Sequence, residues 1–196
     1  MKVAVIKYNA GNIQSVLFAL ERLGIDAVVS ENPEEIKSAD KVIFPGVGEA
    51  GSAMQHLKEH KLDILIKELK QPVLGICLGM QLLCAHSEEG NTPCLNIFPI
   101  QIKKFKTENA LLKIPQIGWN TVYDLKGKLF NKIDSESYMY FVHSYYAEIS
   151  EYGIASTEYI LQYSSALNKN NFYAAQFHPE KSANAGEQLL RNFLEL

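Results

Sequence analysis

The chain has 196 residues, long enough to bury an apolar core without disulfides or a structural metal. It is 47% hydrophobic and 21% charged, as in globular proteins, and its net charge of -3 gives no general attraction to nucleic acid or to anionic membranes. The three cysteines show no paired or metal-ligand spacing, and neither a signal peptide nor an apolar run near the ~20 residues that cross a bilayer is present, so we expect a cytoplasmic protein.

The first half of the chain alternates short apolar runs with segments of helical periodicity. We expect strands over residues 3–8, 26–30, 41–44 and 72–76, where β-branched and aliphatic residues gather. Helices are expected over residues 13–23, from Pro33 behind an Asn32 cap, in two pieces between 49 and 70, and over 78–85. This alternation predicts an α/β fold with a parallel sheet and helices on both faces.

The second half of the chain has an antiparallel pattern. We expect strands over residues 97–105, 116–123, 138–149, 153–159, 165–167 and 172–177, the last two joined by an Asn-rich hairpin turn at 168–171. Residues 182–194 have helical periodicity and end the chain. The prediction is an open mixed sheet, parallel in the N-terminal half and antiparallel in the C-terminal half, in one domain over residues 1–196.

Cys77 stands between Gly75 and Gly79, where a buried strand is predicted to turn into a helix. This is the G-x-nucleophile-x-G pattern of a nucleophile elbow in its expected context. A helix N-terminus beneath the thiol favours the thiolate and offers N–H groups, including that of Leu78, to an oxyanion. The pentapeptide alone leaves open a buried packing cysteine, the usual role of a free thiol. Cys84 lacks the setting of an elbow and is expected to pack in the core, as is Cys94.

A cysteine nucleophile needs a base within hydrogen-bond reach and a group that orients the base. His178 and Glu180 supply these groups, and on an extended segment residues two apart share one face. Taken alone, the segment favours a capping or core histidine beside a solvated glutamate. His143 is a rival base without an acidic residue two positions away. The remaining histidines are expected at the surface: His56, His60 and His86.

A second oxyanion donor is expected from the loop Pro45-Gly46-Val47-Gly48, which ends the third predicted strand. Its glycines allow a peptide N–H to turn toward the site. A lone turn of this kind is common. The cysteine, the glycine loop and the His-x-Glu segment all fall at ends of predicted strands, and this coincidence favours a catalytic site.

Together these stretches resemble the triad-type, class I glutamine amidotransferases, which hydrolyse the amide of glutamine with Cys-His-Glu on an open α/β sheet. The resemblance covers residues 8–181 and is closer to one branch, the glutaminase subunits of imidazole glycerol phosphate synthase. The motifs that carry it are NAGN at 9–12, PGVG at 45–48, GICLGMQLL at 75–83, IPQIGWN at 114–120, YFVHSY at 140–145 and QFHPEKS at 176–182.

The resemblance implies a role for each matched residue and no metal or organic cofactor. Cys77 would attack the substrate amide, His178 would pass a proton to the departing ammonia, and Glu180 would orient His178. The positions that match the oxyanion hole and glutamine pocket are Gly46, Val47, Gly48, Leu78, Gln81, Glu89, His143, Ser144 and Tyr145.

The resemblance also implies a heterodimer, with no nucleic-acid or membrane partner. In this branch the ammonia passes to a separate (β/α)8-barrel cyclase subunit, which makes imidazole glycerol phosphate and AICAR in histidine biosynthesis. Gln116 stands where the branch usually has histidine, a departure that touches no triad residue. The positions that match the docking face are Asn12, Trp119, Asn120 and Lys181.

Three alternative functions stay open at this stage. The chain could be the glutaminase subunit of another synthase, such as anthranilate or aminodeoxychorismate synthase, or could serve a sugar-modifying pathway. It could be an inactive regulatory domain of the same fold, against which the intact triad residues argue. A cysteine peptidase of related fold is disfavoured by the matches to the glutamine pocket.

Overall fold

The computed structural model describes residues 1–9, 11–109 and 111–196. Ala10, which belongs to the motif at 9–12, lies outside the described residues. The helices are α1 (Ile13–Arg22), α2 (Pro33–Lys37), α3 (Ala50–Glu59), α4 (Leu62–Glu68), α5 (Leu78–Leu83) and α6 (Ala183–Leu194), with 3-10 helices η1 (Glu89–Asn91), η2 (Lys128–Phe130) and η3 (Pro179–Lys181). The strands of the N-terminal half are β1 (Val3–Ile6), β2 (Val28–Ser30), β3 (Lys41–Phe44), β4 (Val73–Ile76), β5 (His86–Ser87) and β6 (Thr92–Pro93). Those of the C-terminal half are β7 (Gln101–Lys104), β8 (Gln116–Val122), β9 (Ser137–His143), β10 (Tyr145–Ala147), β11 (Gly153–Tyr159), β12 (Leu161–Lys169) and β13 (Phe172–Ala175).

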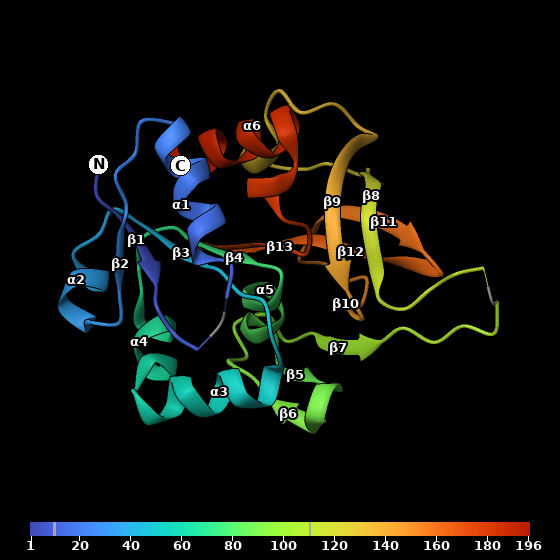
Figure 1. The fold of residues 1–196 in the computed structure, drawn as a ribbon, viewed down its shortest axis with the longest axis horizontal. Helices are drawn as coiled ribbons and strands as arrows, with labels where there is room; N and C mark the ends of the chain where they lie inside the picture. Colours follow the sequence, from blue (N-terminus) through green and yellow to red (C-terminus); the bar gives the residue numbers. More distant parts are fainter. Residues whose placement is uncertain (10, 110) are drawn as a thin grey trace.

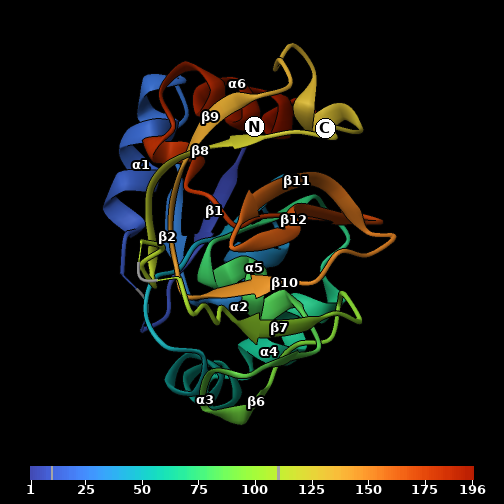
Figure 2. The ribbon, with the colours of Figure 1, turned by 90° about the vertical axis from the view of Figure 1, so that its right-hand side faces the viewer.

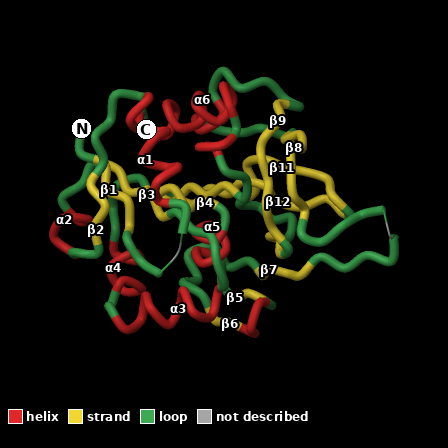
Figure 3. The backbone as a smooth tube through the Cα atoms, viewed as in Figure 1, coloured by secondary structure: helices red, strands yellow, loops and turns green. Residues whose placement is uncertain are grey.

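Eleven strands in the described part of the chain form one sheet, in the order β2-β1-β3-β4-β13-β12-β10-β7-β5-β6 with β11 on β12. Helices α1 and α6 cover one face of the sheet, and α3, α4 and α5 lie on the other (Figures 1 and 3). Among the described residues, none of the helices combines the length and apolar character needed to span a membrane.

The N-terminal strands pair as the alternating pattern predicts. β1 lies parallel to β2 and β3, and β4 lies parallel to β3 and β13. Along β1, Val3 and Val5 belong to the core under α1 and α6, whereas Ala4 and Ile6 belong to the core on the opposite face. A strand buried on both faces needs a continuous apolar run, which explains why no polar residue interrupts β1. The prediction of a mixed α/β sheet is confirmed.

The prediction of a single strand over 138–149 is wrong, because the chain changes sheets at Ser144. β9 pairs with β8 in a separate two-stranded ribbon, whereas β10 pairs with β7 and β12 in the main sheet. Figure 2 shows β8 and β9 running side by side. Met139, Phe141 and Ala147 are all buried at even spacing. The alternation therefore continues in phase through the break, and the sequence pattern carries no sign of it.

Other differences concern the ends of elements. The strand expected over 97–105 is reduced to β7, because the Ile97 and Phe98 N–H groups both donate to the Leu83 carbonyl rather than to a strand. Pro99, which has no N–H to donate, follows them. β12 begins earlier than expected, at Leu161. The short elements β5, β6, η1 and η2 carry too few residues for periodicity to indicate them.

The turn from β4 into α5 brings backbone against backbone. Cys77, at the turn, has φ 52° and ψ -107°, a conformation that costs a non-glycine residue free energy. A Cβ atom on Gly79 would overlap the carbonyl oxygen of Phe44, and one on Gly75 would lie 3.0 Å from the Gly79 carbonyl. The two glycines therefore let α5 approach the ends of β3 and β4.

Replacing Gly79 by alanine should destabilise the fold by about 3 kcal/mol, because the new methyl group has no space beside the Phe44 carbonyl. Urea unfolding followed by circular dichroism measures the change. Gly24→Ala is the control: nothing lies within 4 Å of its added Cβ, so only its positive φ of 76° opposes alanine, at a cost of about 1 kcal/mol. Equal losses in the two variants would contradict the packing argument.

Candidate active site

The adjacent parallel strands β4 and β13 bring Cys77 and His178 to one edge of the sheet. Ile76 pairs with Ala175, and the Cys77 N–H donates to the Ala175 carbonyl at 2.8 Å. The chain continues past β13 to His178, whose N–H donates to the Tyr140 carbonyl of β9 at 2.9 Å. Cys77 and His178 are both buried.

His178 and Glu180 form a buried pair, but not on an extended strand as expected. Pro179 begins the 3-10 helix η3, and the Lys181 N–H donates back to the His178 carbonyl at 3.0 Å. This turn carries the Glu180 carboxylate back to the ring, with Oε1 2.7 Å from His178 Nδ1. The correction follows from proline, whose fixed φ suits the first position of a helical turn.

The environment of His178 favours its protonated form. Burial alone would lower its pKa, but hydrogen bonding and electrostatic attraction to Cys77 and Glu180 outweigh burial and raise the pKa to about 10. Nδ1 is held by the carboxylate, which leaves Nε2 as the ring nitrogen for the sulfur. The arrangement can therefore hold an imidazolium beside a nucleophile at neutral pH.

Asn12 also contacts this pair, although sequence reasoning placed it only on a docking face. Its Nδ2 donates to Glu180 Oε1 and lies 3.4 Å from His178 Nδ1. Asn12 precedes α1 with a left-handed φ of 71°, a conformation in which asparagine is enriched. That preference, directly after Gly11, is the signal that could have marked a turn here.

The glycine loop after β3 points a carbonyl at the elbow. The Leu78 N–H, expected as an oxyanion donor, donates to the Gly46 carbonyl at 3.2 Å. The Tyr8 hydroxyl donates to the Pro45 carbonyl at 2.6 Å, and the Gly11 N–H donates to the Val47 carbonyl at 3.3 Å. The peptide between Gly46 and Val47 thus turns its oxygen toward Leu78, and the Val47 N–H points the opposite way.

A pocket of about 260 Å³ opens beside Cys77. It brings together the residues predicted for the oxyanion hole and glutamine pocket, apart from Gly46, which is not among the lining residues. Sequence reasoning missed Pro115 and Val142, which also line the pocket. The Cys77 thiol donates to the Val142 carbonyl at 3.7 Å, a backbone contact that no side-chain pattern could indicate.

His143 is part of the pocket wall rather than a free base. Its Nδ1 lies 2.7 Å from the Tyr145 carbonyl, and its Nε2 lies 3.1 Å from Gln116 Oε1 and 3.2 Å from the Tyr163 hydroxyl. Burial lowers its pKa to about 4, with the nearby His178 acting in the same direction. His143 is therefore neutral at pH 7, and both ring nitrogens already have partners.

A chain of amide groups links the pocket to the sulfur. Gln81 Nε2 donates to the Tyr145 carbonyl at 3.1 Å and to Gln176 Oε1 at 2.9 Å. Gln176 Nε2 in turn donates to Cys77 Sγ at 3.7 Å. Gln176 was not predicted as a site residue, although its position two residues before His178 could have marked it.

The positions matched to a docking face are spread over several elements. Trp119 on β8 is 52% exposed and packs edge-on against Tyr140, with ring centroids 5.8 Å apart. Asn120 donates to the Glu158 carbonyl at 3.0 Å, and Lys181 on η3 is exposed.

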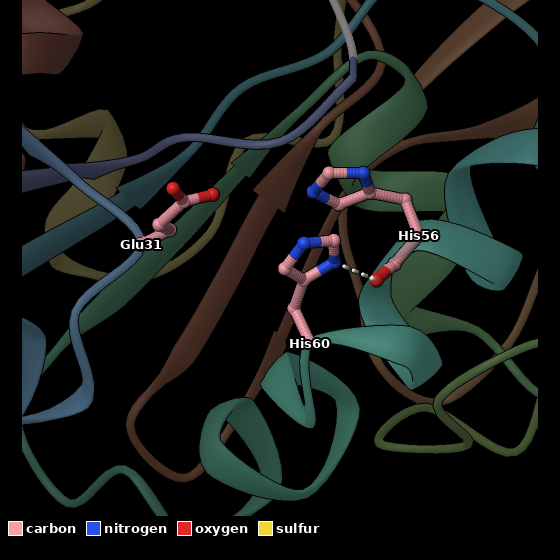
Figure 4. Close-up of side chains that lie close together, drawn as sticks. All are labelled: Glu31, His56 and His60. Carbon is pink, nitrogen blue, oxygen red and sulfur yellow. Dashed lines mark hydrogen bonds between the residues drawn. The ribbon is translucent and has the colours of Figure 1, made fainter.

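One group of potential metal ligands in the described part of the chain comprises Glu31, His56 and His60, with ligand atoms within 4.8 Å of one another (Figure 4). The two imidazoles stack with centroids 4.1 Å apart and planes inclined by 19°. Ring-nitrogen lone pairs lie in the ring plane, so two stacked rings do not aim at a common point. The His60 Nδ1–H also donates to the His56 carbonyl at 3.0 Å. The group is arranged as a stacked pair, not as a chelate.

Comparison with known proteins shows the family to which the chain belongs. Residues 4–196 match the sequence profile of the family described as glutamine amidotransferase class-I. The chain belongs to this family and is a glutamine amidotransferase. A solved structure of a glutamine amidotransferase has a TM-score of 0.73 at 20% identity, covering 98% of this chain and 97% of that one, a likeness that shows the fold alone.

Curated relatives narrow the family to one branch. The chain is 60% identical to imidazole glycerol phosphate synthase subunit HisH of Bacteroides fragilis over the full length of both chains. It is 58% identical to the HisH subunit of Bacteroides thetaiotaomicron, again over both full lengths. With HisH of Idiomarina loihiensis it shares 46% identity, covering all of this chain and 98% of the relative.

The His178–Glu180 pair gives a pH prediction that is clearest in a Cys77→Ser background, where no thiol titrates beside the ring. There the Glu180 carboxylate still raises the pKa of His178, so Glu180→Gln should move the NMR titration midpoint of His178 down, because burial then dominates. The stabilisation that Glu180 gives to protonated His178 should be present at low pH and be lost as pH rises through that midpoint, which urea unfolding of the two variants at several pH values measures. An equal midpoint with and without Glu180 would contradict the assignment.

Proposed function

We propose that this chain is the glutaminase subunit of an imidazole glycerol phosphate synthase, hydrolysing glutamine at Cys77 and passing the ammonia to a partner subunit. The observation that carries the proposal is the meeting of Cys77, His178 and Glu180 beside a pocket of about 260 Å³. The relatives named imidazole glycerol phosphate synthase subunit HisH support the assignment to this synthase, which acts in histidine biosynthesis.

The first half-reaction is acyl transfer to sulfur. The Cys77 thiolate attacks the side-chain amide carbon of glutamine, and the carbonyl π electrons move to oxygen. As the tetrahedral intermediate collapses, the C–N bond breaks and protonated His178 gives its proton to the leaving nitrogen, releasing ammonia. The enzyme is then a γ-glutamyl thioester with neutral His178, whose Nδ1–H the Glu180 carboxylate holds in place.

The second half-reaction returns the enzyme to its starting state. Neutral His178 takes a proton from water as the oxygen attacks the thioester carbonyl. Collapse of this second tetrahedral intermediate breaks the C–S bond and releases glutamate. The thiolate and the imidazolium re-form as a pair. A buried Glu180 suits this cycle because it stabilises the imidazolium without leaving its hydrogen bond.

The pocket has the chemistry to select an α-amino acid. Glu89 is the acidic residue among its lining side chains, and its Oε2 accepts the Ala50 N–H at 2.8 Å, which fixes the carboxylate. We assign the substrate α-ammonium group to Glu89 because an opposite charge is the strongest partner for it there. Ser144 and Tyr145, at the junction of β9 and β10, also line the pocket.

The outer face of the β8–β9 ribbon is the surface we assign to the partner, a (β/α)8-barrel cyclase. Ile117 is 65% exposed and Tyr138 62% exposed, and Trp119 and Val142 add to the same face. A contiguous exposed apolar patch of this kind marks an interaction site. Ammonia would leave beside Trp119 and Lys181 and enter the barrel, where it is incorporated into imidazole glycerol phosphate with release of AICAR.

Cys77→Ala should lower glutamine hydrolysis by about 10⁶-fold, because the nucleophile is lost while the fold remains. Supplied with an ammonium salt, the complex with its cyclase should still form imidazole glycerol phosphate. Measuring glutamate release and imidazole glycerol phosphate formation in parallel checks both the loss of glutamine hydrolysis and the retained reaction with ammonia. Glutamine-dependent turnover retained in Cys77→Ala would contradict the proposal. If the partner subunit instead adds ammonia to an acceptor from another pathway, the chain belongs to a different synthase.

The loop at 45–48 predicts that the subunit is nearly idle alone. The Gly46 carbonyl occupies the Leu78 N–H, and the adjoining peptides are held by Tyr8 and Gly11. Turning only the peptide between Gly46 and Val47 would free Leu78 and aim the Val47 N–H at the oxyanion. One missing oxyanion donor costs about 10²–10³ in rate, so docking of the partner with its acceptor should raise glutamate release by about 10²-fold or more.

The measurement is glutamate release by the isolated subunit, by the complex, and by the complex with acceptor ligand bound. Gly46→Ala is not a usable control, because its added Cβ would meet the Tyr8 hydroxyl. Tyr8→Phe is the control: it frees the Pro45 carbonyl, which belongs to the preceding peptide and is not moved by the turn, so its isolated subunit should stay as idle as the wild type. Equal rates in the three wild-type states would eliminate gating and leave the glutaminase assignment standing.

A further inference from the structure

Gln176 is a buried amide that the reaction described above does not use. It follows β13 directly, and its side chain is fully buried. Because Ala175 pairs with Ile76, Gln176 and Cys77 lie next to each other at the ends of the paired parallel strands β13 and β4. A fully buried amide side chain is retained only where its polar atoms have partners.

The orientation of the Gln176 amide is fixed by its neighbours. The Tyr145 carbonyl can only accept, so the group of Gln81 that lies 3.1 Å from it is the NH₂. That same NH₂ lies 2.9 Å from Gln176, which must therefore present its oxygen to Gln81. The remaining end of Gln176, its own NH₂, faces Cys77 Sγ at 3.7 Å. The Tyr145 carbonyl therefore fixes the orientation of Gln81, and Gln81 fixes that of Gln176, so that the Gln176 NH₂ points at Cys77 Sγ.

We propose that Gln176 is a further catalytic residue, which donates a hydrogen bond to the Cys77 thiolate and stabilises it before attack. The inference rests on the proposed function of Cys77 as the nucleophile. His178 supplies the proton for the leaving group, whereas Gln176 supplies a neutral donor that stays in place through both half-reactions. A hydrogen bond to a charged group is stronger than one to a neutral group, so the contact favours thiolate over thiol.

The same amide joins the nucleophile to the pocket. Gln81 lines the pocket and holds Gln176 Oε1, so a change in Gln81 on substrate binding reaches the sulfur through one side chain. The titratable groups around Cys77 are Tyr8 after β1, His143 at the end of β9, His178 with Glu180 at η3, and Glu89 and Tyr145, which line the same pocket. All of these remain in place when only Gln176 is changed.

The test is the rate at which iodoacetamide alkylates Cys77, followed by mass spectrometry of its peptide from pH 5 to 10. Chemical cleavage at Met80 places Cys77 in a different peptide from Cys84 and Cys94, so these two thiols do not interfere. In Gln176→Met, which keeps the length but loses the donor, alkylation near pH 7 should fall about tenfold and its rise with pH should shift upward. The value of kcat for glutamine hydrolysis by the complex should fall with it.

Gln176→Glu separates donation from support of Gln81. Ionised glutamate keeps an oxygen for the Gln81 NH₂ but puts a second oxygen, instead of a donor, beside the sulfur, so this variant is compared at the alkaline end of the profile, where the carboxyl has lost its proton. We expect alkylation in this variant to be at least as slow as in Gln176→Met. Wild-type alkylation in Gln176→Glu, or a rise in KM for glutamine with unchanged alkylation in both variants, would overturn the proposal in favour of an indirect role through Gln81.

Gln71→Met is the matched control for loss of a hydrogen-bonded amide elsewhere in the fold, since Gln71 Nε2 donates to the Ile36 carbonyl at 2.9 Å. It should lose stability without any change in the alkylation profile. The same experiment keeps the two proposals apart. If alkylated wild-type enzyme still hydrolyses glutamine, Cys77 is not the nucleophile. If alkylation stops hydrolysis but both Gln176 variants react like the wild type, only the role of Gln176 falls.

Discussion

The parallel pairing of β4 with β13 is the contact on which the site depends. It joins segments 99 residues apart and places Cys77, Gln176 and His178 at the end of two neighbouring strands. A slip of one residue in this register would turn Gln176 to the other face of the sheet and carry His178 away from the sulfur. β13 pairs in turn with its antiparallel neighbour β12, so the hairpin between them sets the positions of Gln176, His178 and Glu180.

Once the register is set, the site is built from costly local features. Cys77 has a strained backbone, and the His178–Glu180 pair is buried with Glu180 Oε2 lacking a hydrogen-bond partner among the described residues. Such features destabilise a fold unless surrounding packing maintains them. Here the apolar strands β1, β3 and β4, buried on both faces, provide that packing directly beneath the elbow.

Much of this arrangement follows from local pattern. The strands and helices of the first half, the elbow at Cys77 and the Asn32 cap of α2 each depend on residues within a few positions. What the sequence could not indicate depends on distant partners. The change of sheet at Ser144, the contact of Asn12 with Glu180 and the donation from Gln176 to Cys77 join residues whose proximity arises only after β9 and β13 are placed. The turn at Pro179 could have been predicted in part. Proline at the first position favours a helical turn, but the His-x-Glu spacing also fits an extended strand, which is the structure that was expected.

The carbonyl of Gly46 on the Leu78 N–H has a pharmacological consequence. An aldehyde analogue of glutamine inhibits through a hemithioacetal whose oxygen needs the same N–H groups as the tetrahedral intermediate. It therefore has to displace the Gly46 carbonyl first and should bind the assembled synthase in preference to the free subunit. In an alkylating analogue the sulfur attacks a carbon that loses its leaving group and forms no oxyanion there, so alkylation needs no such rearrangement. In a mixture, the aldehyde would bind the assembled synthase in preference, whereas the alkylating analogue would react with the assembled synthase and the free subunit alike.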